Sequence, residues 1–158
     1  MFWLAKISQK KVIGNWLNFF FSEYGTIVSK KYTYKTKVYY EDTDVGGIVY
    51  YAKYLHFIER ARTEMIYQQF SLNHNQLKND HDVIFVVRSC NIKYLKSAYF
   101  EDELKINTSV ASKTPVRLNL IQEVKRKAEL LVLVEVELAV INSKGSVKKL
   151  SLNLLEKI

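Results

Sequence analysis

The sequence has 158 residues, 48% of them hydrophobic and 25% charged, which is typical of a soluble protein with one globular domain and a single core. The formal net charge is +8, but residues 1–37 carry +6 of it and the rest of the chain only +2. Because the basic excess lies in one terminal segment, the composition argues against a folded domain that binds nucleic acid.

Several classes of site are excluded by residues that the sequence lacks. Cys90 is the single cysteine, so an intrachain disulfide cannot form and a reducing, cytoplasmic compartment is expected. With three histidines, no pair of cysteines and no HExxH motif, the sequence predicts no metal site. It contains no GxSxG motif, and Cys90 falls within a predicted strand, so serine and cysteine nucleophiles are not supported either.

Residues 1–31 are apolar with scattered lysines. The uncharged run at 12–22 is too short to span a bilayer, and the segment lacks the clean apolar region and cleavage site of a signal peptide. We therefore predict a poorly ordered N-terminal extension over 1–31 and a folded domain over 32–158. The alternative is a weak membrane-surface contact made by Trp3, Trp16 and the neighbouring phenylalanines.

Two elements are predicted before residue 71. Residues 32–40 alternate between two faces, which indicates a strand with one solvated side. From about Tyr51 to Phe70 the apolar residues recur at helical spacing, so we predict a long amphipathic helix. Its buried stripe is formed by Tyr54, Phe57, Ile58, Ala61 and Met65.

After the helix, residues 71–82 are polar and indicate a connection with room for one helical turn. Four strands are then predicted from side chains that repeat with a period of two: 86–94, 104–110, a run that begins at 116, and 129–141. The last is nearly all apolar, so it is expected to be central and buried on both faces. Residues 142–145 form a turn, and 146–158 are expected to be a short edge strand or a terminal helix. A strand, a long helix and four further strands are typical of an α+β domain.

The turn at 41–47 holds the candidate catalytic group. It contains three carboxylates and two glycines (EDTDVGG), and a helix N-terminus follows it. Unpaired N–H groups at such an end favour negative charge nearby and can stabilise charge that develops on a reacting oxygen. A carboxylate base beside such a site is the minimum equipment for acyl transfer or hydrolysis, and Asp44 is the candidate. The alternative is that Asp44 only caps the turn.

Two segments carry a family resemblance: YYEDTDVGGIVYYAKYLHFIERARTEM, which spans 39–65, and FVVRSCNIKYLKSAYFEDEL, which spans 85–104. They resemble the 4-hydroxybenzoyl-CoA thioesterase family, and within it the Tol–Pal-associated acyl-CoA thioesterase branch. The resemblance implies the hotdog fold, in which a curved antiparallel sheet wraps one long helix. It also implies hydrolysis of acyl-CoA to free acid and CoA without a cofactor. Homodimers joined edge to edge, or homotetramers, with active sites at the dimer interface, are implied as well.

The resemblance assigns roles within the first segment. Asp44 falls on the family's catalytic aspartate, whereas Glu41 and Asp42 are expected to be turn and surface acids. Tyr51 stands where the Tol–Pal-associated branch has histidine and the 4-hydroxybenzoyl-CoA thioesterases have tyrosine. In the latter, the backbone N–H at this position points at the thioester carbonyl. The residues expected to bind substrate are Tyr40, Gly47, Val49, Tyr50, Tyr51 and Tyr54.

Glu59 lies in the middle of the predicted helix, where some hotdog thioesterases carry a catalytic glutamate. The match to the Asp44 pattern favours an ion pair of Glu59 with Arg62 or Arg88 instead. Two other functions stay open. One is a hotdog dehydratase, whose catalytic-histidine motif is not found in the sequence. The other is a non-catalytic partner of the envelope or lipid-synthesis machinery.

Overall fold

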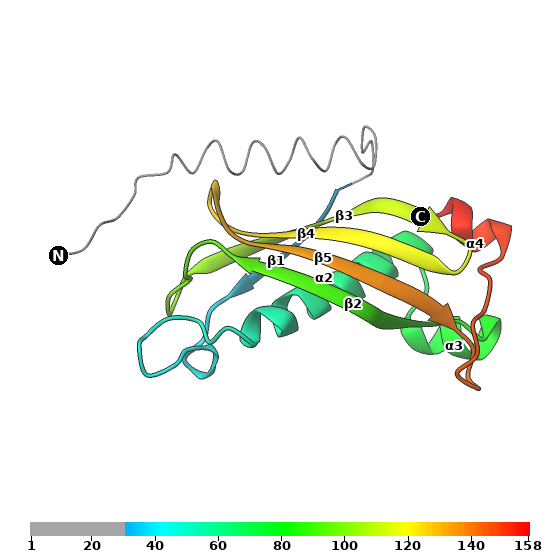
Figure 1. The fold of residues 1–158 in the computed structure, drawn as a ribbon, viewed down its shortest axis with the longest axis horizontal. Helices are drawn as coiled ribbons and strands as arrows, with labels where there is room; N and C mark the ends of the chain where they lie inside the picture. Colours follow the sequence, from blue (N-terminus) through cyan, green and yellow to red (C-terminus); the bar gives the residue numbers. More distant parts are fainter. Residues whose placement is uncertain (1–30) are drawn as a thin grey trace.

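The computed structural model describes residues 31–158 (Figure 1). The predictions of poor order and of membrane contact for residues 1–31 fall outside the described residues, apart from Lys31. The elements run in the order β1 (Tyr32–Lys37), the 3₁₀ turn η1 (Tyr40–Asp42), α2 (Lys53–Phe70), α3 (His74–His81), β2 (Ile84–Tyr94), β3 (Glu103–Thr114), β4 (Arg117–Arg126), β5 (Glu129–Ile141) and α4 (Leu152–Glu156). Within this part of the chain, no helix is long and apolar enough to cross a bilayer.

The strands form one antiparallel sheet in the order β1-β3-β4-β5-β2. β3, β4 and β5 follow one another as hairpins, and β1 and β2 lie at the two edges. Figure 1 shows the sheet curving along α2, which lies against one of its faces. The turn between β1 and α2 lies at one end of the sheet, and α3 and α4 lie at the other. The predicted α+β arrangement, a curved antiparallel sheet around one long helix, is confirmed.

The core lies between α2 and the sheet. All the residues of the predicted helical stripe are buried, because the helical period brings them onto one face. Gln122 of β4 is a fully buried polar exception, whose amide nitrogen donates to the Ile58 carbonyl at 3.0 Å and to Thr108 Oγ1 at 2.9 Å. Its amide oxygen accepts from Arg62 at 2.9 Å. These bonds satisfy the buried amide and fix α2 against the sheet.

The ends of several elements differ from the prediction. β1 ends at Lys37, and Tyr40 lies in η1 with 81% of its surface exposed. The first residue of α2 is Lys53 rather than Tyr51. The polar connection contains the complete helix α3 instead of one turn. A capping box formed by Asn73 and Gln76 begins it, and this signal in the sequence was missed.

The C-terminal third agrees with prediction in outline. β5 spans the predicted residues 129–141, but its inward-facing residues are buried while its outward-facing residues are only half-buried. The predicted burial of β5 is therefore complete on its inward face and only partial on its outward face. In the segment 146–158, Val147 pairs with Ile141 in an isolated bridge, and α4 follows. Of the two alternatives for this segment, the terminal helix is present, whereas a single bridge stands in place of the edge strand.

Candidate active site

Residues 43–49 fold as a small hairpin, the acidic hairpin, between η1 and α2. Thr43 and Val49 face each other in an isolated antiparallel bridge. The Asp44 amide donates to the Ile48 carbonyl at 2.9 Å, and the Gly47 amide donates to the Asp44 carbonyl at 3.0 Å. Gly47 has φ +73°, a left-handed conformation that favours glycine. The backbone of Asp44 is therefore held by two hydrogen bonds.

The Asp44 side chain is exposed on this hairpin. Its Oδ1 accepts a hydrogen bond of 2.8 Å from the Gly46 amide, and a Cβ atom at Gly46 would come within 3.1 Å of that oxygen. The capping role considered for Asp44 is therefore present at Oδ1. Its Oδ2 has no hydrogen-bond or ion-pair partner within residues 31–158. One oxygen thus orients the carboxylate, and the other can still accept a proton or contact a ligand.

Asp42 is not the surface acid that was predicted, because only 5% of its surface is exposed. Its Oδ2 accepts from the Tyr39 amide at 2.9 Å, and its Oδ1 lies 3.3 Å from Lys53 Nζ. Its carbonyl accepts from the Tyr50 amide at 2.9 Å. A buried carboxylate needs such partners, and these tie the end of β1 to the first residue of α2. Glu41 is exposed, as predicted.

The N-terminus of α2 has no side-chain cap. Ala52 occupies the N-cap position, and its side chain makes no hydrogen bond. Within residues 31–158, the Tyr51 amide donates to no acceptor. Unpaired amides at a helix start carry partial positive charge, so this end of α2 can stabilise negative charge on a bound oxygen.

Four tyrosines form the tyrosine cluster at this helix start: Tyr50, Tyr51, Tyr54 and Tyr94. The ring centroids of Tyr50 and Tyr51 are 4.6 Å apart, and Tyr94 packs edge-on against Tyr51 at 6.4 Å. The Tyr94 hydroxyl donates to the Tyr51 carbonyl at 3.1 Å. Burial raises the pKa of Tyr94, so its hydroxyl stays protonated and can donate at neutral pH. Sequence reasoning assigned Tyr94 no role in the site, since it lies 43 residues from Tyr51 and no local pattern links the two.

Four of the predicted substrate-binding residues lie in or beside the tyrosine cluster. Tyr50 and Tyr51 are exposed there. Tyr54 is buried, and its hydroxyl accepts from the Ala98 amide at 2.9 Å. Val49 is buried as well, and its amide donates to the Ala98 carbonyl at 2.9 Å. Two of these tyrosines thus face solvent, whereas Tyr54 and Val49 support the cluster from beneath.

The other two predicted residues have different surroundings. The exposed Tyr40 ring packs edge-on against Phe100 at 6.1 Å, and Gly47 lies in the acidic hairpin. A hollow of 1380 Å³ beside β1 is lined by neither of them and contains no residue of the tyrosine cluster. Within residues 31–158, no three His, Cys, Asp or Glu side chains are grouped so that they could hold a metal ion. The candidate site is therefore an exposed surface of a single chain.

Glu59 does not make the contact that was predicted for it. It faces solvent and accepts a hydrogen bond of 2.9 Å from the Thr63 hydroxyl. Arg62 donates to the buried core amide, and Arg88 pairs with Glu137 at 2.6 Å. The prediction of an ion pair between Glu59 and either arginine is wrong for residues 31–158, because both arginines bind partners in the sheet. Burial lowers the pKa of Arg62, and the charge of Glu59 acts on that pKa in the opposite direction.

Comparison with known proteins gives relatives that are similar to this chain in sequence. Residues 38–157 match the Thioesterase-like superfamily. The chain is 40% identical over 111 residues to the acyl-CoA thioester hydrolase YbgC of Escherichia coli O6:H1, and the match spans 70% of this chain and 80% of that protein. It is 41% identical over 80 residues to the acyl-CoA thioesterase YbgC of Haemophilus influenzae, spanning 51% of this chain and 58% of that protein.

A solved structure supports the fold as well. The probable thioesterase from Bartonella henselae has 30% sequence identity and a TM-score of 0.73, and the match covers 77% of this chain and 100% of that one. The hotdog fold predicted from the sequence is confirmed by this likeness.

Proposed function

The chain belongs to the Thioesterase-like superfamily, a family of thioester hydrolases, and we propose that it hydrolyses acyl-CoA to a free carboxylic acid and CoA, with Asp44 as the reacting carboxylate. One observation carries the proposal: a carboxylate with a free oxygen and an uncapped helix start occur in one short segment. Asp44 Oδ2 and the Tyr51 amide both lack partners within residues 31–158. The relatives named as acyl-CoA thioester hydrolases support the substrate class.

Thioester hydrolysis needs attack at the carbonyl carbon, a donor at the carbonyl oxygen and a proton for the leaving sulfur. In one route Asp44 takes a proton from a water molecule whose oxygen attacks the carbon. The Tyr51 amide then donates to the oxyanion, the C–S bond breaks, and the CoA thiolate takes up that proton. In the other route Asp44 Oδ2 attacks the carbon itself and CoA leaves as the thiolate. Water then hydrolyses the resulting anhydride, which regenerates the Asp44 carboxylate, releases the acid and supplies the proton that the thiolate takes up. Both routes use the same two groups.

Tyr51 acts through its backbone in this proposal. An oxyanion donor in the main chain does not depend on the side chain that the residue carries. The Tyr51 ring is 60% exposed and packs against Tyr50 and Tyr94, so it offers aromatic surface to an acyl group. Contact of substrate with Tyr40 and Gly47 stays a prediction.

A homodimer would complete this exposed surface. β2 has 11 residues and lies at an edge of the sheet, where it pairs with β5 on one side. A long exposed edge tends to associate with another strand unless it is covered. Because β2 ends at Tyr94, a second copy bound along this edge would also cover the tyrosine cluster. We infer a homodimer, alone or doubled to a homotetramer. A cytoplasmic location, association with the Tol–Pal machinery and independence of a cofactor stay predictions.

A thiol-release assay over a panel of acyl-CoA substrates tests the function. We expect release of CoA thiol from at least one substrate, and loss of that release in Asp44→Asn. A folded protein that releases no thiol from any substrate would favour the non-catalytic alternative. Conversion of a hydroxyacyl thioester without thiol release would favour a dehydratase.

A further inference from the structure

Residues 95–102, the support loop, connect β2 to β3 and hold the acidic hairpin from both sides. At the end of the hairpin, the amide of its last residue, Val49, donates to the Ala98 carbonyl at 2.9 Å. Before the hairpin, the Val38 amide donates to the Asp102 carbonyl at 2.9 Å. The position of the hairpin therefore follows the position of the support loop.

The support loop also contacts the first turn of α2. The Ala98 amide donates to the Tyr54 hydroxyl at 2.9 Å in a buried contact. Ile48, on the hairpin, pairs with Tyr99 in an isolated bridge. One loop thus contacts both parts of the candidate site, the hairpin that carries Asp44 and the uncapped helix start.

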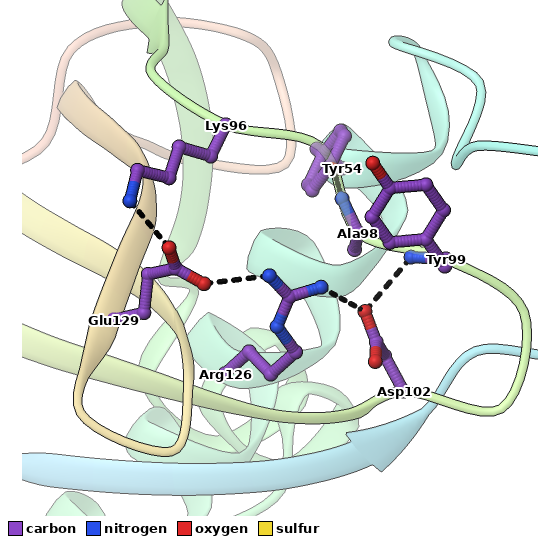
Figure 2. Close-up of polar contacts among 7 residues, drawn as sticks. All are labelled: Tyr54, Lys96, Ala98, Tyr99, Asp102, Arg126 and Glu129. Atoms are coloured by element: carbon purple, nitrogen blue, oxygen red, sulfur yellow. Dashed lines mark hydrogen bonds and ion pairs between the residues drawn. The ribbon is translucent and has the colours of Figure 1, made fainter.

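Arg126, the last residue of β4, joins the support loop to Glu129, the first residue of β5 (Figure 2). Its guanidinium donates to Asp102 Oδ2 at 2.7 Å and to Glu129 Oε2 at 2.6 Å. The same Asp102 oxygen accepts from the Tyr99 amide at 2.8 Å. At the other end of the loop, Lys96 forms an ion pair with Glu129. Figure 2 shows that both ends of the loop are tied to this one arginine.

The support loop needs such a hold, because Glu101 within it has φ +68°. This left-handed conformation is unfavourable for a residue other than glycine and persists where surrounding contacts maintain it. The Arg126 and Asp102 side chains are 26% and 20% exposed, so water screens their attraction and limits what the pair adds to global stability. The planar fork of an arginine nevertheless fixes direction between two acceptors. The pair therefore controls the geometry of the loop more than the stability of the fold.

We propose that Arg126 is a positioning residue for hydrolysis, which acts through Asp102 and the support loop to hold Asp44 and the Tyr51 amide in reacting geometry. The inference rests on the proposed thioesterase function and extends it to residues that touch no substrate. The inference requires that loss of the two guanidinium hydrogen bonds of Arg126 misplaces the reacting groups. Substrate binding and the fold should be largely kept.

The test compares kcat and KM of the wild-type full chain with those of Arg126→Met and Arg126→Lys, on an acyl-CoA that the wild type hydrolyses. Methionine removes both guanidinium hydrogen bonds. We expect kcat to fall roughly 10- to 100-fold and KM to change by no more than about twofold, since a misplacement of reacting groups by ~1 Å can lower the rate by ~10²-fold. Lysine keeps the charge without the fork, so its kcat should lie between the two. Wild-type kcat in both variants would overturn the inference, and the lysine variant still decides it if the methionine variant does not fold.

Asp82→Asn is the matched control. Asp82 follows α3 directly, and Figure 1 shows α3 at the other end of the sheet from the turn between β1 and α2. It accepts from the Ser143 amide at 2.8 Å and lies 3.8 Å from Lys148 Nζ. We expect its melting temperature to fall about as much as that of Arg126→Met, with an unchanged kcat. If the two variants lose activity equally for equal loss of stability, Arg126 is merely structural and the inference fails.

A double-mutant cycle separates positioning from a general effect. In an Asp44→Asn background no reacting carboxylate remains to be misplaced, and only the effect through the Tyr51 amide persists. Arg126→Met should therefore lower the residual rate by a smaller factor than in the wild type. The same factor in both backgrounds would contradict the inference. Failure of the proposed function has a different signature, namely a wild-type kcat in Asp44→Asn itself.

Discussion

The hydroxyl of Tyr94 donates a hydrogen bond of 3.1 Å to the backbone carbonyl of Tyr51. The last residue of strand β2 thereby holds Tyr51, which immediately precedes the N-cap of α2 and whose amide has no acceptor within residues 31–158. The two rings also meet edge-on, with centroids 6.4 Å apart. Since the carbonyl and the amide of Tyr51 belong to adjacent peptide planes, holding the first restricts the direction of the second.

Tyr94→Phe should lower kcat while the protein stays folded. The substitution removes the hydroxyl and keeps the ring, and a hydrogen bond of this kind contributes ~1 kcal/mol, which corresponds to a roughly three- to tenfold change in rate. Steady-state kinetics and a thermal melt measure the two effects. Tyr67→Phe is the control, because the Tyr67 ring packs against His74 near the far end of α2 and should not affect kcat. An unchanged kcat in Tyr94→Phe would show that this bond does not orient Tyr51.

Asp44→Asn should leave the fold intact and lower kcat by roughly 10²–10⁴-fold, the usual contribution of a positioned base. Asparagine can still accept from the Gly46 amide, so the cap on the turn is kept while the basic oxygen is lost. Glu41→Gln serves as the control, because Glu41 is an exposed acid of the same turn. Turnover of Asp44→Asn close to that of the wild type would refute the catalytic assignment.

Substitutions at Tyr51 distinguish its side chain from its amide. Tyr51→Phe and Tyr51→His should keep most activity, with a shift in acyl preference, because both retain the N–H group. Tyr51→Pro deletes that donor and should cost roughly 10²–10³ in kcat. Proline is tolerated near a helix start, so circular dichroism should report a native fold.

The same three variants can also contradict the proposal that the Tyr51 amide, and not its side chain, stabilises the oxyanion. If Tyr51→Phe is as inactive as Tyr51→Pro, the phenol takes part in the reaction. If Tyr51→His is much faster than the wild type, tyrosine at this position weakens the enzyme, and a non-catalytic role gains support.

A truncated chain that begins at Ser29 should stay oligomeric and active. The proposed interface is the edge strand β2, which lies outside the removed segment. Light scattering and the thiol-release assay on the truncated chain measure the two properties. A folded and active monomer would show that the site needs no partner.

Several features of this protein were determined by the sequence alone. The buried stripe of α2 and the strands after it could be predicted, because burial of side chains at a period of 3.6 or two residues is a local property. The acidic turn could be recognised in the same way, since its acids and glycines are contiguous. Asp44 was a candidate on this basis, whereas Tyr50 and Tyr51 were candidates through the family resemblance of the segment that contains them.

Only the tertiary structure decided how the acids of that turn differ. Asp42 and Asp44 lie two positions apart and are chemically identical, yet Asp42 is buried against Lys53 and Asp44 is exposed. The approach of the helix to the end of β1 decides which of them receives the lysine. No property of the turn itself encodes that approach.

The contacts that hold the candidate site were likewise decided by the tertiary structure. Tyr94 meets Tyr51 across 43 residues of chain, and Arg126 meets Asp102 across 24. Such pairs depend on strand order, on register and on where the helix crosses the sheet. These are properties of distant segments packed together, and a periodic pattern read along the chain does not contain them.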